Sequence, residues 1–134
     1  GSLITQLGHV SDLSDVMIKC LDFEKSKNSV YNCSGEKGVT IKGLIYMCAE
    51  VCGLNKNEIS LIKFDFEKLD PKSRKGFPIR LNHYQTDISK IKNDLNWKPK
   101  FDLLSGLKDS FIKDYQFKKD NEFDRTSDSV LFNS

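Results

Sequence analysis

The pattern of apolar positions predicts two amphipathic helices in the first half of the chain. The first runs from Val10 to Leu21 with Ser11 as its N-cap, and its apolar residues fall at 10, 13, 17, 20 and 21. The second follows Thr40 as N-cap and ends at Gly53, with Ile41, Leu44, Ile45, Cys48 and Cys52 on its apolar side.

Two further helices are predicted in the second half. One begins with Asp87 as its cap and runs to about Leu95, with Ile88 and Ile91 inward. Trp97 should pack over the end of this helix, and Pro99 prevents its continuation. The other follows Asp102 as cap, runs from Leu103 to about Phe117, and has its core stripe at Leu104, Leu107 and Phe111.

Short extended segments lie between the helices. Ser29–Cys33 and Ile59–Phe64 are rich in β-forming residues, and Pro78 favours an extended Phe77–Arg80. The resulting order of helices and strands predicts an α/β fold. Two or three short strands make a poor sheet by themselves, so the chain reads as part of a larger protein.

Composition agrees with one domain that shares a surface with a missing partner. The 134 residues are 38% hydrophobic and 30% charged, with a net charge of +2, which by itself indicates neither nucleic acid nor membrane. No apolar run is long enough to span a bilayer. We divide the chain into a cloning remnant at 1–2, a lobe at 3–117 and a charged tail at 118–134.

The four cysteines predict no disulfide and no metal site. Cys20, Cys33, Cys48 and Cys52 include no Cys-x-x-Cys pair, and the two histidines lie far from them in sequence. We expect reduced, buried thiols of a cytosolic-type protein.

Several segments resemble the C-terminal signature of the extended short-chain dehydrogenase/reductases. Asp87-Ile-Ser-Lys90, Leu95-Asn-Trp-Lys-Pro99 and Leu103-Leu-Ser-Gly-Leu107 are similar to that family's Asp-x-Ser-Lys, Leu-Gly-Trp-x-Pro and Leu-x-x-Gly-Leu, in the same order. His9-Val-Ser-Asp-Leu13 and Val30–Glu36 resemble two earlier family segments. The resemblance implies the C-terminal lobe and closing elements of an extended Rossmann-type fold, with few short strands and about four helices.

Within this family one branch is most similar. Tyr31-Asn-Cys-Ser-Gly-Glu-Lys37, Lys75-Gly-Phe-Pro-Ile-Arg80 and Asn96–Leu103 look like segments of the chloroplast stem-loop-binding proteins and the cyanobacterial mRNA-binding proteins. The resemblance implies RNA as the partner, with RNA processing as an activity of a full-length protein. It also implies a cytoplasmic location, or the chloroplast stroma if the organism bears plastids.

The candidate RNA- or substrate-binding residues gather around a basic segment. Within 68–80, five lysines and arginines stand against one acid, and aromatic residues follow or interrupt them. Cationic side chains neutralise phosphates and exposed aromatic rings stack on unpaired bases. We therefore expect binding by Lys72, Arg74, Lys75, Arg80, His83, Tyr84 and His9. The competing interpretation is a solvated loop, with a structural hydrogen bond for His9.

No catalytic residue is expected in this chain. Ser34–Gly38 lacks the spacing of a dinucleotide-binding glycine loop and reads as a plain turn. Tyr115-Gln-Phe-Lys-Lys119 matches the family's Tyr-x-x-x-Lys pair only by chance, because it lies too far along the chain. We expect no cofactor here, and NAD(P) only in a full-length protein.

Two alternatives remain open. The chain could be the substrate-binding lobe of an NAD-dependent epimerase or dehydratase acting on a nucleotide sugar, although Phe77 replaces the acid expected after Arg74 and Gly76. It could also be an interaction module that pairs through an exposed core face. The expected partners are RNA, a missing N-terminal Rossmann half and another copy of the chain, but not a membrane.

Overall fold

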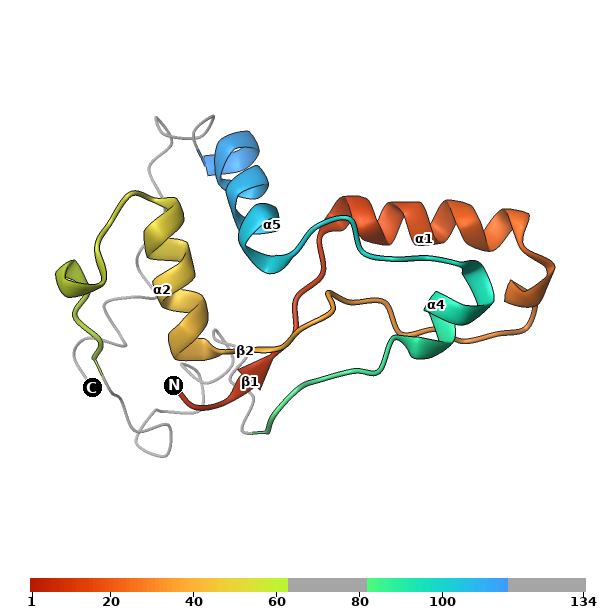
Figure 1. Ribbon diagram of the computed structural model, residues 1–134, viewed down its shortest axis with the longest axis horizontal. Coiled ribbons are helices and arrows are strands. Elements are labelled where there is room, and N and C mark those ends of the chain that lie inside the picture. The colour runs from red at the N-terminus through yellow and green to blue at the C-terminus, as the bar shows by residue number, and fades with distance from the viewer. Residues whose placement is uncertain (63–81, 116–134) are drawn as a thin grey trace, which may run out of the picture.

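The computed structural model describes residues 1–62 and 82–115 of the chain (Figure 1). Four α-helices are present there: α1 (Val10–Asp22), α2 (Ile41–Val51), α4 (Ser89–Leu95) and α5 (Leu103–Ser110). Two strands accompany them, β1 (Ile4–Thr5) and β2 (Val39–Thr40). Two 3-10 turns at Glu24–Ser26 and Lys56–Glu58, and a π turn at Phe111–Tyr115, complete the set. This confirms the predicted mixed α/β fold with few short strands and about four helices.

The sheet is a short antiparallel pair in which Ile4 lies opposite Thr40 and Thr5 opposite Val39. Hydrogen bonds extend the pairing beyond the strands, because the Gly35 amide donates to the Leu7 carbonyl over 3.1 Å. On the other edge of β1, the Tyr84 amide donates to the Ile4 carbonyl over 2.8 Å. The two segments run so close that a Cβ on Gly35 would overlap the Leu7 carbonyl oxygen, which explains a glycine there.

The core forms where α1 meets α4. Ile91 and Leu95 are fully buried and Trp97 is 2% exposed, with Val16 and Ile88 packed beside them. The inward positions predicted for α4 and the packing of Trp97 are therefore confirmed. Asn96, at the C-cap of α4, has φ 45° and ψ 45°, a left-handed conformation that asparagine tolerates better than most residues other than glycine.

The residues that α1 buries are not those of its apolar row. Asp12 and Val16 are the residues that α1 buries, whereas Val10 is 71% exposed and Leu21 is 86% exposed. The apolar period correctly predicted a helix, but it did not determine which side meets the core of this chain. Ser11 is also not the N-cap: His9 is, and its side chain accepts a hydrogen bond from the Ser11 amide.

The ends of α2 are confirmed but its packing is not. The Thr40 hydroxyl caps the Gly43 amide over 3.0 Å, and Gly53 ends the turn with a φ of 78°. Cys48 and Cys52 are exposed rather than buried. Ala49, at the margin of the predicted apolar side, is the residue that α2 buries, and α2 packs on α5.

Neither predicted strand is found where it can be checked. Val30–Cys33 is extended and the described part of Ile59–Phe64 is irregular, because a strand requires a hydrogen-bonded neighbour that local sequence cannot supply.

Asp87 lies one residue before the N-cap of α4, although its Oδ1 still accepts from the Ser89 amide at 2.8 Å. Asp102 caps α5 as predicted. Phe77–Arg80 and the 118–134 tail lie outside the described residues.

Candidate functional site

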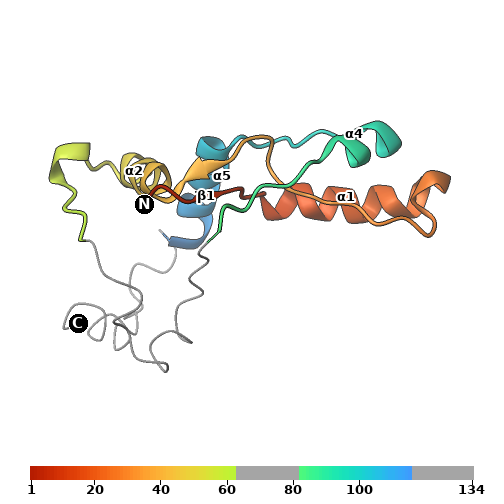
Figure 2. The same ribbon diagram turned by 90° about the horizontal axis from the view of Figure 1, so that it is seen from below.

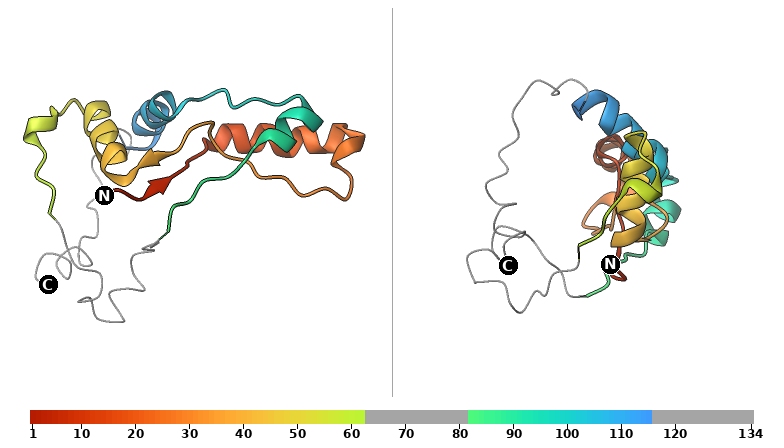
Figure 3. Two further views of the ribbon diagram at one scale, coloured as in Figure 1. Left: turned by 60° about the horizontal axis from the view of Figure 1, so that its bottom comes forward. Right: turned by 90° about the vertical axis from the view of Figure 1, so that its left-hand side faces the viewer.

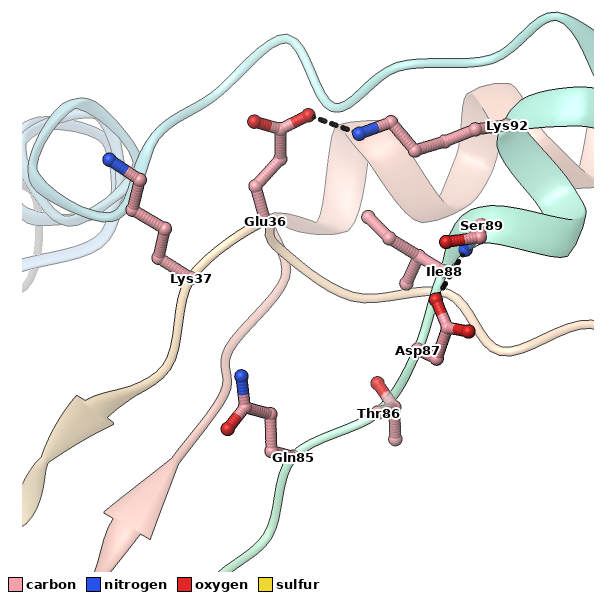
Figure 4. A pocket seen from close by; sticks show the side chains of 8 residues that line it. All are labelled: Glu36, Lys37, Gln85, Thr86, Asp87, Ile88, Ser89 and Lys92. Atoms are coloured by element: carbon pink, nitrogen blue, oxygen red, sulfur yellow. Dashed lines mark hydrogen bonds and ion pairs between the residues drawn. The ribbon is translucent and has the colours of Figure 1, made fainter.

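An open groove of about 590 Å³ lies beside α4 (Figure 4). One wall comes from the turn before β2 and the other from the chain that enters α4. The lining residues are Glu36, Lys37, Gln85, Thr86, Asp87, Ile88, Ser89 and Lys92.

Both acids of the groove are stabilised in their charged form. Glu36 Oε1 lies 2.7 Å from Lys92 Nζ, and this hydrogen bond lowers the pKa of Glu36 below its ordinary value (Figure 4). Hydrogen bonding to Ser89 likewise lowers the pKa of Asp87. Lys37 is exposed and forms no ion pair within the described part of the chain. With two lysines and two carboxylates, the lining has no net charge.

Gln6 holds the two walls of the groove together. It is 5% exposed, and its Oε1 accepts a hydrogen bond from the Thr86 amide over 2.6 Å. Its Nε2 donates to the carbonyl oxygen of Gly35, the residue before Glu36, over 2.5 Å. Sequence reasoning missed this residue because a single polar side chain before a predicted helix carries no signal of what it bridges.

His83 and Tyr84 directly precede the groove residue Gln85. His83 Nδ1 accepts a hydrogen bond from the Ile4 amide over 3.0 Å, which fixes the proton of the neutral ring on Nε2. Tyr84 is 45% exposed. These two predicted residues thus lie along the edge of β1 that faces away from β2, directly before the groove residue Gln85.

His9 lies in a different environment. Its ring stacks on Phe101 with a centroid distance of 3.9 Å, and its side chain is 7% exposed. Nδ1 accepts from the Ser11 amide and Nε2 lies 3.2 Å from Asp109 Oδ2. His9 and His83 therefore have different partners, and the contacts of His9 favour the structural role over ligand binding.

The remaining predicted binding residues, Lys72, Arg74, Lys75 and Arg80, lie outside the described residues. The groove adds residues that the sequence did not single out, including Lys37, Gln85, Thr86, Ser89 and Lys92. A partial signal existed for Lys37, which ends the Ser-Gly-Glu-Lys segment. The sequence gives no signal for the other four, because they line a groove only once the two walls are brought together in the fold.

Gly35 and Gly38 do not leave the open space that a dinucleotide requires. In a dinucleotide fold, glycines let the backbone approach a pyrophosphate. Here the space beside Gly35 is taken by the Leu7 carbonyl, and a Cβ on Gly38 would meet Ile4 Cγ2 at 2.7 Å. Both glycines accommodate β1 and the residues after it.

Residues 1–62 and 82–115 contain neither a metal-binding cluster nor a membrane-spanning helix. Within these residues no cluster of three or more histidine, cysteine or acidic side chains could hold a metal ion. The helices described there are all too short or too polar to cross a bilayer.

The fold of this chain is similar to part of the fold of two solved enzymes. The chain superposes on dTDP-glucose 4,6-dehydratase of Bacillus anthracis with a TM-score of 0.62 and 22% identity, covering 91% of this chain and 33% of that one. It superposes on UDP-glucose 4-epimerase of Thermotoga maritima with a TM-score of 0.62 and 21% identity, covering 91% of this chain and 34% of that one. These likenesses show the fold.

Sequence comparison finds a similar plant protein. No family model matches the chain. It is 39% identical over 134 residues to the chloroplast stem-loop binding protein of 41 kDa b of Arabidopsis thaliana, across 98% of this chain and 35% of that protein. The predicted resemblance to the extended short-chain dehydrogenase/reductases is confirmed. The chain spans about a third of the length of the proteins it matches, which fits the C-terminal part of such a protein.

Proposed function

We propose that this chain is the C-terminal part of an RNA-binding protein and contacts stem-loop RNA through the groove and the basic segment before it. The observation that carries the proposal is the 39% identity, over nearly the whole chain, to a protein named for stem-loop binding. NAD(P), if a full-length protein holds it, binds outside this chain.

The two parts of the proposed interface have different tasks. The groove lining has no net charge, so it supplies hydrogen-bonding groups such as Gln85, Thr86 and Ser89 for bases or riboses. The basic segment at 68–80 supplies the charge that neutralises phosphates. His83 Nε2–H and the exposed part of the Tyr84 ring join the two, as a donor and a stacking face.

A titration of fluorescently labelled stem-loop RNA against the full-length protein tests the proposal. Affinity should fall as salt rises from about 50 to 200 mM, and the double variant Arg74→Ala with Lys75→Ala should reduce the slope of log Kd against log salt by about two. The matched control is Lys27→Ala with Lys56→Ala, two lysines remote from the groove lining. An unchanged slope in the first double variant contradicts the role of the basic segment.

A second arm separates RNA binding from the nucleotide-sugar alternative. Gln85→Ala with Ser89→Ala should weaken RNA binding and leave the salt slope unchanged, because neither side chain carries charge. UDP-glucose added in excess should not displace the RNA. Displacement by UDP-glucose, with no loss of RNA affinity in the groove variant, would assign the groove to a sugar nucleotide instead.

A further inference from the structure

We propose that Lys37, Lys92 and Lys98 form a site for a phosphate group of the RNA backbone, and that the Glu36 carboxylate occupies this site while RNA is absent. A bound phosphate takes the place of Glu36 on Lys92. Because the ligand is RNA, this inference rests on the function proposed above. It adds an acid within the site that the RNA has to displace.

The charges of the groove are unevenly distributed. Asp87 lies where the chain enters α4, whereas Glu36 extends from the turn before β2 toward Lys92 (Figure 4). The hydrogen bond from Lys92 lowers the pKa of Glu36 most, and the nearby charges of Lys98 and Lys37 lower it further. Three lysines therefore surround one acid, so the Glu36 end of the groove is positively charged although the lining as a whole is neutral.

The three lysines come from three separate segments. Lys37 lies in the turn before β2, Lys92 in α4, and Lys98 in the segment that joins α4 to α5. This joining segment lies beside the turn in Figure 2 and in the left-hand view of Figure 3. Trp97, directly before Lys98, is 2% exposed and fixes the path of the segment. The fold thus directs cations at one point from several sides.

The lysines differ in what they already bind. Lys37 and Lys98 are exposed and form no ion pair among residues 1–62 and 82–115. Lys92 pairs with Glu36 over 2.7 Å, and the two side chains are 34% and 47% exposed. Such an exposed ion pair contributes little to stability, because water screens both charges. Another anion can therefore replace the Glu36 carboxylate at little cost.

A backbone phosphate suits this arrangement better than the carboxylate does. Each ammonium group offers three donors, and lysine binds phosphate as a point charge from any side. Glu36 pairs with Lys92 alone and leaves the other two lysines without an anion. A phosphate among all three would place the adjoining ribose or base over the hydrogen-bonding groups of Gln85 and Thr86 in the same groove. Two neighbouring anions repel each other, so Glu36 has to leave Lys92.

The substitution Glu36→Gln in the full-length protein tests the inference with labelled stem-loop RNA. Glutamine keeps the size of the side chain but removes the competing charge, so affinity at about 50 mM salt should rise about three- to tenfold. The slope of log Kd against log salt should increase by about one, because no carboxylate is left to take up a cation as the phosphate releases one. A misfolded protein cannot produce this gain. Unchanged or weaker binding by Glu36→Gln overturns the inference.

Glu24→Gln is the matched control. Glu24 also pairs with a lysine, Lys27, over 2.6 Å, but neither residue lines the groove. This variant changes the net charge by the same amount, and its RNA affinity should stay within about twofold of the original. A gain in Glu24→Gln equal to that in Glu36→Gln would show an effect of overall charge and overturn the inference.

Removal of the two unpaired lysines tests whether they act together with Glu36. The double variant Lys37→Ala with Lys98→Ala should bind RNA at least about threefold more weakly at 50 mM salt. Adding Glu36→Gln to this double variant should give a smaller gain than it gives in the original protein, because the residues share one ligand. An undiminished gain would contradict a shared site.

Inorganic phosphate distinguishes the RNA backbone from a free phosphate compound. About 10 mM phosphate at constant ionic strength should leave the RNA bound, because one phosphate contact is a small part of the interface. Release of the RNA that requires Lys37 and Lys98 would assign the lysines to a free phosphate compound and overturn the inference. A full-length protein that binds no stem-loop RNA overturns both proposals, whereas RNA binding that Glu36→Gln does not strengthen overturns this one alone.

Discussion

Asp12 Oδ1 accepts a hydrogen bond from the backbone amide of Lys100 over 2.8 Å, which joins the first turn of α1 to a segment 88 residues away. The other oxygen of the same carboxylate accepts from the Phe101 amide over 3.3 Å. Asp12 is 3% exposed and lies in the first turn of α1, where the helix dipole favours a negative charge. One buried side chain thus fixes the approach of α5 to α1.

Replacing Asp12 should destabilise the chain. Asp12→Ala leaves two backbone amides without acceptors in a nearly buried place, and we expect a loss of about 2–4 kcal/mol in the free energy of unfolding. Urea denaturation followed by Trp97 fluorescence measures it. Asp22→Ala, an exposed acid at the other end of α1, is the control and should change stability by less than about 0.5 kcal/mol. Equal effects of the two substitutions would show that the Asp12 contacts contribute nothing.

His9 should contribute through its cap and its stacking. His9→Ala removes the acceptor for the Ser11 amide and the ring that stacks on Phe101, so a loss of about 1–3 kcal/mol is expected. His9→Asp restores the cap without the ring and should recover part of the loss. If His9→Asp is as unstable as His9→Ala, the capping bond is not the source of the stability.

Gln6 should affect the groove as well as stability. Gln6→Glu keeps an acceptor for the Thr86 amide but loses the donor to Gly35 and buries a charge, which should cost about 2 kcal/mol or more. Because Gln6 aligns the two walls, stem-loop RNA affinity of the full-length protein should fall even where the protein remains folded. Thr5→Ser, a neighbouring substitution outside these contacts, is the control. RNA affinity unchanged in folded Gln6→Glu would separate the groove from RNA binding.

Acid should weaken the attachment of α5. The amide and hydroxyl of Ser105 lower the pKa of Asp102 by hydrogen bonding, and Lys113 lowers the pKa of Asp109 in the same way. A carboxyl whose pKa is lower in the folded state adds stability above its unfolded pKa, near 4, and loses it as the pH falls through the lower folded value. The urea midpoint should therefore drop below about pH 4.

The substitution Asp102→Asn keeps a capping side chain on α5 but removes the carboxyl group that titrates. Asparagine also caps helices well, so stability near neutral pH should change little, while the fall in acid should become shallower. If the urea midpoint falls as steeply with pH in Asp102→Asn as in the original chain, Asp102 does not contribute to the pH dependence.

The sequence by itself determined the local features of this protein. The apolar period located the helices, Thr40 and Asp102 marked where two of them begin, and Gly53 marked where one ends. Each of these depends on residues a few positions apart, where capping and periodicity act. The segments around Asp87–Pro99 also carried the family resemblance, which the comparisons confirmed.

The tertiary structure decided which residues meet across the chain. The sequence could not show that Val16, and not Leu13 or Met17, turns to the core, because the apolar period predicts a covered side without identifying what covers it. It could not show that Gln6 bridges Thr86 and Gly35, since those residues are brought together only by the path of the backbone. Val30–Cys33 has the sequence of a strand and remains unpaired among the described residues, because strand pairing depends on a neighbour and not on propensity alone.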